Sequence, residues 1–190
     1  MMLLALITPF TVQSQNQAVR ELYAKSENDV VNLVWSWNDI VHETTAVDFE
    51  TGDFTQAPFV IDQTYPWVIT ENAYEGKYCA KSDGVVNNKY AKLKVQLEVL
   101  EDGPLSFYVK TSSEAGYDVL EFLVNSLVDQ KWSGEIGWTQ YTRKMKKGSY
   151  ALEWRYRKDT SGSEGDDLAY LDNICFPPIS VVKMLESVKN

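Results

Sequence analysis

The feature that most constrains the fold is the stretch from Ala91 to Leu100 (AKLKVQLEVL), in which apolar and polar side chains alternate strictly. A period of two is typical of a strand in an antiparallel sheet, with one face on the core and the other in water. We therefore expect a long half-buried strand here. Its apolar face comprises Leu93, Val95, Leu97 and Val99.

The same alternation recurs in shorter segments separated by turn signals. Leu105 to Lys110 (LSFYVK) and Tyr150 to Arg157 (YALEWRYR) alternate, and Leu168 to Phe176 reads as a closing strand. About ten short strands at a spacing of roughly 8–12 residues are typical of a sandwich or jelly roll. We predict an all-β fold, a jelly-roll β-sandwich of two antiparallel sheets, over residues 47–178.

The remaining segments are expected to flank this domain. Residues 1–15 begin with an apolar run (MMLLALITPFTV) that is too short to span a membrane. This run predicts a signal-peptide-like leader. The alternative is an N-terminal strand or a buried helix. Residues 16–46 form an arm, helical or unstructured over Asn16 to Asn28, with one strand from Val30 to Trp37. Whether that strand completes the sandwich stays open. Residues 179–190 are expected to be a short helix or a frayed tail.

The charge and the cysteine content indicate which binding partners and which cellular compartment to expect. The net charge of −9 and the pI near 4.7 predict repulsion from phosphate backbones, so we expect no nucleic-acid partner. The acidity fits either plain solubility or a cation site. The two cysteines, Cys79 and Cys175, lie in strand-like runs and are expected to be unpaired buried thiols, although an exported protein could join them in a disulfide.

Catalytic residue patterns are scarce in this chain. Its one histidine, His42, lies in a linker, and a Ser-His-Asp or Cys-His arrangement would require it beside a nucleophile and a carboxylate. Zinc-ligand spacings and glycine-rich phosphate loops are absent from the sequence. We expect no enzyme activity.

Carboxylates near the two ends of the predicted domain suggest a calcium site. Asp48 and Glu50 flank Phe49, so both are expected on the face opposite that ring. Asp172 precedes Ile174 by two residues and is expected to point inward with it, where it needs a cation or a hydrogen-bonding partner. If the first and last strands are neighbours, these carboxylates meet. Lesser candidates are Asp118, Asp166 and Asp167.

Aromatic side chains offer a second kind of site. Trp67, Trp132, Trp138 and Trp154 are candidates for a surface on which a sugar or protein partner stacks. Trp154 alternates with Leu152 and is expected in the core, whereas Trp132 beside Ser133-Gly134 is expected to be exposed. The expected ligand-binding residues are Tyr65, Tyr117 and Trp132.

A series of motifs resembles a known family. DFETGDF, PWVIT, EGKYCAKS, LSFYVKTSSEAGYDVLEFLV, WSGEIGWTQ, KGSYALEWRYRKD and LAYLDNICFP occur in this order between Val47 and Pro177. They resemble the cleaved-adhesin (gingipain and haemagglutinin adhesin) domain, which is distantly similar to MAM-type jelly rolls.

This resemblance implies several properties. It implies structural calcium, a secreted or cell-surface location, and a haemagglutinin-like role in binding a host protein or glycan. It also implies a place within a larger multidomain protein. No segment after the leader is long and apolar enough to span a bilayer, so we expect no insertion into a membrane. The alternative is a carbohydrate-binding module, or a structural spacer domain of a larger secreted peptidase or glycosidase.

Overall fold

Strands make up all the regular secondary structure of the described residues, as the alternation predicts. The computed structural model describes residues 19–27, 30–37 and 46–180, and the chain divides into two units, Met1–Ile40 and Val41–Asn190. Within these ranges no helix has the length and apolar character needed to cross a membrane. The predicted leader over residues 1–15 and the last ten residues of the predicted tail lie outside the described residues.

The first unit contains a hairpin of two antiparallel strands, β1 (Val19–Glu27) and β2 (Val30–Trp37). The strand expected over β2 is confirmed, and its partner is β1. The expectation of a helical or unstructured segment before it is wrong over Val19–Glu27, so the arm has two strands rather than one. The apolar residues Leu22 to Ala24 are consecutive, so β1 lacks the period of two, and pairing with β2 makes it a strand.

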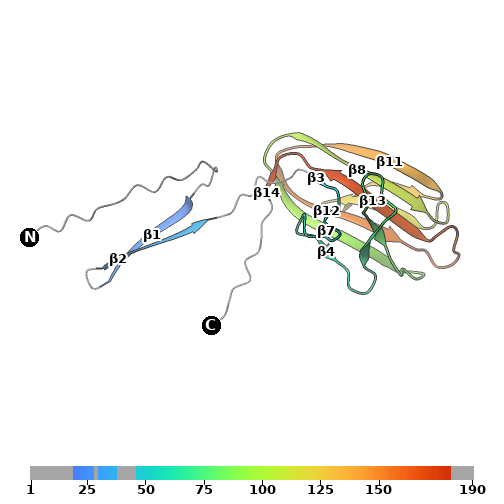
Figure 1. Cartoon of the computed structure of the whole chain (residues 1–190), viewed down its shortest axis with the longest axis horizontal. Helices are drawn as coiled ribbons and strands as arrows, with labels where there is room; N and C mark the ends of the chain where they lie inside the picture. Colours follow the sequence, from blue (N-terminus) through green and yellow to red (C-terminus); the bar gives the residue numbers. More distant parts are fainter. Residues whose placement is uncertain (1–18, 28–29, 38–45, 181–190) are drawn as a thin grey trace, which may run out of the picture. The chain divides into compact units, whose positions relative to one another are not determined.

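The second unit is built from two antiparallel sheets of six strands each, which confirms the predicted β-sandwich (Figure 1). Sheet I has the order β10-β9-β12-β7-β14, with β4 also paired to β7. Its strands are β4 (Val60–Ile61), β7 (Tyr90–Val99), β9 (Val119–Val124), β10 (Leu127–Ser133), β12 (Gly148–Arg157) and β14 (Ile179–Ser180).

Sheet II has the order β11-β8-β13-β6-β5, with β3 also paired to β13. Its strands are β3 (Ala46–Val47), β5 (Trp67–Thr70), β6 (Cys79–Ser82), β8 (Gly103–Ser112), β11 (Ile136–Met145) and β13 (Leu168–Cys175). The first strand of the unit, β3, is thus a neighbour of the last long strand, β13, as the calcium hypothesis requires.

The core lies between the two sheets and is rich in aromatic rings. The predicted apolar face of β7 is confirmed, because Leu93, Val95, Leu97 and Val99 are all 4% exposed or less. Phe107 of β8 lies 4.9 Å from Phe122 of β9 and 5.4 Å from Trp154 of β12, between ring centroids. The expected core position of Trp154 is confirmed, since it is fully buried.

Two predicted boundaries change. The expected placement of Asp48 and Glu50 opposite Phe49 implies a strand from Val47 to Glu50, but β3 ends at Val47 and the chain turns at Phe49, whose φ is +58°. The tail was expected to be helical or frayed from Ile179, but Ile179–Ser180 forms β14 and pairs with β7. Both differences occur where a short segment is held by a neighbouring strand or a turn, which local propensity does not register.

Candidate metal pocket and adjoining aromatic surface

A pocket of about 360 Å³ near β3 and β13 brings together carboxylates from distant parts of the chain. All three residues predicted to bind metal line it, together with a fourth acid, Glu75, that the sequence did not single out. We call this site the acidic pocket. Its lining residues are Asp48, Glu50, Glu75, Gly76, Asp172 and Asn173.

Asp172 is completely buried, but not for the expected reason. Leu171 pairs with Val109 and both are core residues, so Asp172, paired with Tyr108, lies on the opposite, outer face of sheet II. A break in register follows Asp172, and Asn173 has a φ of +47°. The break returns Ile174 to the core. The expectation that Asp172 points inward in phase with Ile174 is therefore wrong.

The loop between β5 and β6, residues 71–78, buries Asp172 from outside. Oδ2 of Asp172 accepts hydrogen bonds from the backbone N–H groups of Tyr74 (2.8 Å) and Glu75 (3.3 Å). Oδ1 accepts one from the N–H of Asn173 (2.7 Å). The Asn173 amide in turn donates to Oε2 of Glu75 (3.0 Å). One carboxylate thus holds both its own strand and the β5–β6 loop.

Glu50 holds the other end of the same loop. Its Oε1 accepts hydrogen bonds from the backbone N–H groups of Lys77 and Tyr78, each at 2.8 Å. Asp48 accepts hydrogen bonds from the Gln56 amide (2.7 Å) and the Glu50 N–H (3.0 Å) through Oδ1. Phe49 between them is fully buried while both acids are exposed, so the expected opposite placement is confirmed, although a turn rather than a strand produces it.

Gly76 makes room for the Glu50 carboxylate. Its φ is +72°, a conformation that residues with a Cβ rarely adopt. A Cβ at this position would also lie 2.5 Å from Cδ and from Oε1 of Glu50. Both the backbone conformation and the close approach therefore require glycine, and the loop closes over the pocket because of it.

Negative charge in the acidic pocket has no basic counterpart among the described residues. None of the ion pairs in this part of the chain involves Asp48, Glu50, Glu75 or Asp172. Burial, with a contribution from the Glu50 charge, raises the pKa of Asp172 to about 6 despite its three N–H donors. The Gln56 hydrogen bond lowers the pKa of Asp48. A cation would relieve the repulsion that Asp172 experiences.

The oxygen donors of the acidic pocket are of the chemical types that calcium prefers. Calcium prefers six to eight hard oxygens from carboxylates, carbonyls and water. The pocket offers four carboxylates and the Asn173 amide, and the missing Cβ at Gly76 leaves the Glu50 carboxylate room to sit there. Within the described ranges, no three acidic, histidine or cysteine side chains are close enough to form a ready-made ligand set. The carboxylates would therefore have to move together around an ion.

The lesser acidic candidates lie at a different place in the fold. Lys158, itself only 3% exposed, pairs with Asp118 (3.1 Å) and Asp167 (2.6 Å). Asp118 is completely buried and also accepts a hydrogen bond from the Asp159 N–H. Asp166 donates its backbone N–H to the Ser112 hydroxyl. An ammonium group thus already supplies the positive charge that Asp118 and Asp167 require.

The three predicted ligand-binding aromatics lie on separate segments. Tyr117 precedes β9 and is 57% exposed, and Tyr65 lies between β4 and β5, partly buried against the core. Trp132 was expected to be exposed and is only 8% exposed, so that expectation is wrong. Its ring packs in the core against Phe107 and Tyr141, at centroid distances of 6.1 and 5.6 Å. The glycine that follows Ser133 ends β10 without turning Trp132 outward.

A different aromatic group is exposed beside the acidic pocket. Tyr74 of the β5–β6 loop stacks on Tyr108 of β8, with centroids 3.6 Å apart and rings 13° from parallel. Trp138 of β11 lies edge-on to Tyr74 at 6.2 Å. Tyr74 is 41% exposed. We call Tyr74, Tyr108 and Trp138 the aromatic surface. Trp138 was among the candidates from the sequence, but Tyr108 was not. The alternation around Phe107 places Tyr108 on the opposite face of its strand and could have identified it.

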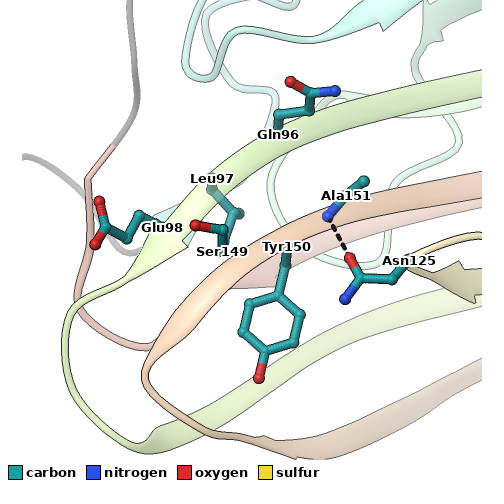
Figure 2. A pocket seen from close by; sticks show the side chains of 7 residues that line it. All are labelled: Gln96, Leu97, Glu98, Asn125, Ser149, Tyr150 and Ala151. Atoms are coloured by element: carbon teal, nitrogen blue, oxygen red, sulfur yellow. Dashed lines mark hydrogen bonds between the residues drawn. The ribbon is translucent and has the colours of Figure 1, made fainter.

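A further pocket lies on sheet I and is lined by none of the residues predicted to bind metal or ligand. It measures about 520 Å³, and Figure 2 shows among its lining residues Tyr150 of β12 and Asn125 from the turn between β9 and β10. Asn125 accepts a hydrogen bond from the Ala151 N–H at 2.8 Å, so part of its polar lining is already satisfied. The lining residues are Gln96, Leu97, Glu98, Asn125, Ser149, Tyr150 and Ala151.

Both cysteines are free, as expected, but only Cys79 is buried and Cys175 is partly exposed. His42 lies outside the described residues. Cys79 is fully buried on β6, where burial and the charge of Asp172 raise the pKa of its thiol to about 12. A thiol with this pKa stays protonated at neutral pH and is a poor nucleophile. Its S–H donates to the carbonyl of Asn72 instead.

The second unit thus forms a β-sandwich of two antiparallel sheets with the acidic pocket beside its first and last long strands. No family model and no curated protein matches the sequence. Among solved structures, the chain is similar to the secreted serine protease VesC from Vibrio cholerae (17% identity, TM-score 0.52, covering 80% of this chain and 31% of that one). It is also similar to the K3 cleaved adhesin domain of Lys-gingipain from Porphyromonas gingivalis W83 (16% identity, TM-score 0.50, covering 71% and 97%).

These similarities confirm the predicted resemblance to cleaved-adhesin domains at the level of the fold. The chain spans about a third of the VesC chain but nearly all of the K3 domain. A third structure, the CBM22-1 xylan-binding domain of Paenibacillus barcinonensis Xyn10C, covers 74% of the chain at 19% identity and a TM-score of 0.44.

Proposed function

We propose that residues 46–180 form a non-catalytic binding module that is stabilised by calcium and acts at the cell surface or outside the cell. The observation that carries this proposal is the acidic pocket. Asp48 and Glu50 come from the start of the domain and Asp172 from its last long strand, and the pocket has no basic partner among the described residues. A calcium ion there would neutralise these charges and tie the two ends of the domain to the β5–β6 loop.

The proposed ligand is a host protein or a glycan. Support comes from the exposed aromatic surface and from the descriptions of the similar structures, which include an adhesin domain and a xylan-binding domain. The similarity to a secreted protease and to one domain of Lys-gingipain supports a place within a larger secreted protein. The alternative is a spacer that positions a neighbouring peptidase or glycosidase and binds nothing itself.

Calcium titration of the chelator-treated full chain tests the proposal. Isothermal titration with calcium chloride is expected to show binding at one site, and the Glu50→Gln variant is expected to lose most of the affinity because a charged ligand becomes a neutral one. Glu101→Gln is the matched control, since it removes the same charge from an exposed position before β8. Equal calcium binding by both variants would contradict the acidic pocket as the site.

A further inference from the structure

The aromatic surface combines rings from three elements on the outer face of sheet II. Tyr108 on β8 and Trp138 on β11 come from neighbouring strands, and Tyr74 is placed over them by the β5–β6 loop. One face of the Tyr74 ring is stacked on Tyr108, and Trp138 lies edge-on to it. Of the three rings, Tyr74 is exposed, at 41%, whereas Tyr108 and Trp138 are partly buried.

Neutral hydrogen-bonding side chains border these rings. Gln140 is exposed and lies directly opposite Tyr108 in the β8–β11 ladder, and Thr142 is exposed and opposite Ser106. Lys110, the nearby cation on β8, is placed over the Tyr170 ring at 4.9 Å. A pyranose has an apolar C–H face that stacks on an aromatic ring and hydroxyl groups that need such polar neighbours. The surface therefore has the composition that a neutral sugar requires.

Other classes of partner fit this surface less well. A stable protein interface buries about 800 Å² on each partner, which is far more than three partly exposed rings provide. An anionic glycan or nucleic acid would meet the carboxylates of the adjoining acidic pocket. A short oligosaccharide instead needs only a few stacking contacts of the kind that neighbouring aromatic rings offer.

The acidic pocket and the aromatic surface share the same loop. The Tyr74 N–H donates to Asp172, and the Lys77 and Tyr78 N–H groups donate to Glu50, so the acidic residues hold both halves of the segment that carries the Tyr74 ring. Loss of these hydrogen bonds would release the Tyr74 ring that completes the surface.

From these observations we propose that Tyr74, Tyr108 and Trp138 form a binding platform for a neutral pyranose oligosaccharide, and that calcium in the acidic pocket fixes Tyr74 in its stacked position. The second half of this statement rests on the proposed function. The platform itself rests on the ring geometry alone.

Titration of the full chain with neutral hexasaccharides tests the platform. The probes are cellohexaose, xylohexaose, mannohexaose and maltohexaose, with binding followed by calorimetry and tryptophan fluorescence in saturating calcium. We expect at least one of them to bind. Tyr74→Ala and Trp138→Ala are expected to weaken that binding about tenfold or more. The matched control is Tyr90→Ala, because Tyr90 is 42% exposed and lies on β7 of the other sheet.

The outcomes separate this platform from the proposed function. Absence of binding to all four probes, or equal binding by Tyr74→Ala and Tyr90→Ala, overturns the platform even if calcium stabilises the domain. Binding that needs Tyr74 but survives removal of calcium by EGTA overturns the coupling and keeps the platform. Loss of binding in EGTA together with loss in Tyr74→Ala supports both. Circular dichroism of each variant, with a spectrum like that of the wild type, establishes that the loss is not unfolding.

Discussion

Tyr74 and Asp172 are 98 residues apart in the chain and are joined by a 2.8 Å hydrogen bond from the Tyr74 N–H to the Asp172 carboxylate. The same two residues belong to the two sites of the domain, since Asp172 lines the acidic pocket and the Tyr74 ring stacks on Tyr108. We therefore expect a chemical change at one site to alter ligand binding at the other.

Replacement of Asp172 by asparagine is expected to lower both stability and calcium binding. Both carboxylate oxygens accept backbone N–H bonds and asparagine offers only one acceptor oxygen, so without calcium the variant should melt at a lower temperature than the wild type. Its gain in melting temperature on adding calcium should be largely lost. Scanning calorimetry with and without calcium measures both values. A full calcium response in Asp172→Asn would exclude this carboxylate as a ligand.

Gly76→Ala is expected to destabilise the domain more than Gly84→Ala. Both glycines have a positive φ, +72° and +61°, so each alanine costs about 1 kcal/mol in backbone strain. A Cβ at residue 76 would also collide with the Glu50 carboxylate, whereas one at residue 84 would meet nothing within 4 Å. Urea unfolding of the two variants measures the difference. Equal losses of unfolding free energy would show that the Glu50 side chain moves away freely.

Lys158→Met is expected to cost about 3–5 kcal/mol of unfolding free energy, because it leaves the fully buried Asp118 without its cation. Lys146→Met serves as the control. Its side chain is 82% exposed and pairs with Asp102 at the surface, so its removal should change stability by less than about 1 kcal/mol. Chemical denaturation of both variants measures how much the buried ion pair contributes to the free energy of unfolding.

The loss of unfolding free energy caused by Lys158→Met should become smaller at acidic pH. Burial opposes ionisation of Asp167, but the hydrogen bonds of Lys158 and Ser163 and the Lys158 charge together outweigh it and lower the pKa of that carboxyl. A lowered pKa contributes stability that is present above the unfolded-state value of about 3.9 and disappears as pH falls through the folded value. The difference between wild type and variant is therefore expected to decrease from pH 7 to below pH 4. A difference that is constant with pH would contradict this ion pair.

Trp132→Ala and Trp138→Ala are expected to differ in stability although both remove an indole. Trp132 is buried against Phe107, so its loss should cost about 3–5 kcal/mol. Trp138 is only partly buried on the outer face of sheet II, and its loss should cost much less. Equilibrium unfolding followed by circular dichroism measures the two values. A larger loss for Trp138→Ala would place that ring in the core instead.

The parts of the fold that follow from local alternation were predictable. The strict period of two identified β7 and its core face, and the same pattern around Trp154 identified β12. β1 was missed because its apolar residues are consecutive and its strand conformation depends on pairing with β2. The periodicity of β1 by itself therefore did not show that it pairs as a strand.

The acidic pocket was predictable in its members but not in its geometry. Asp48, Glu50 and Asp172 were selected because acids flank a core residue or lie in a closing strand, and the structure brings them together. The break in register at Asn173 and the loop that covers Asp172 involve contacts between residues nearly 100 positions apart. For the same reason Tyr74 was not selected, since its partner Tyr108 lies on another element.

The melting temperature of the full chain with excess calcium and after exhaustive chelation tests the central claim most directly. We predict that calcium raises the melting temperature of the wild type by several degrees, because an ion bound only to the folded state stabilises it by mass action. Glu50→Gln should lose most of this gain, and Glu101→Gln should keep it. A wild-type melting temperature that is the same with calcium and after chelation would contradict the account.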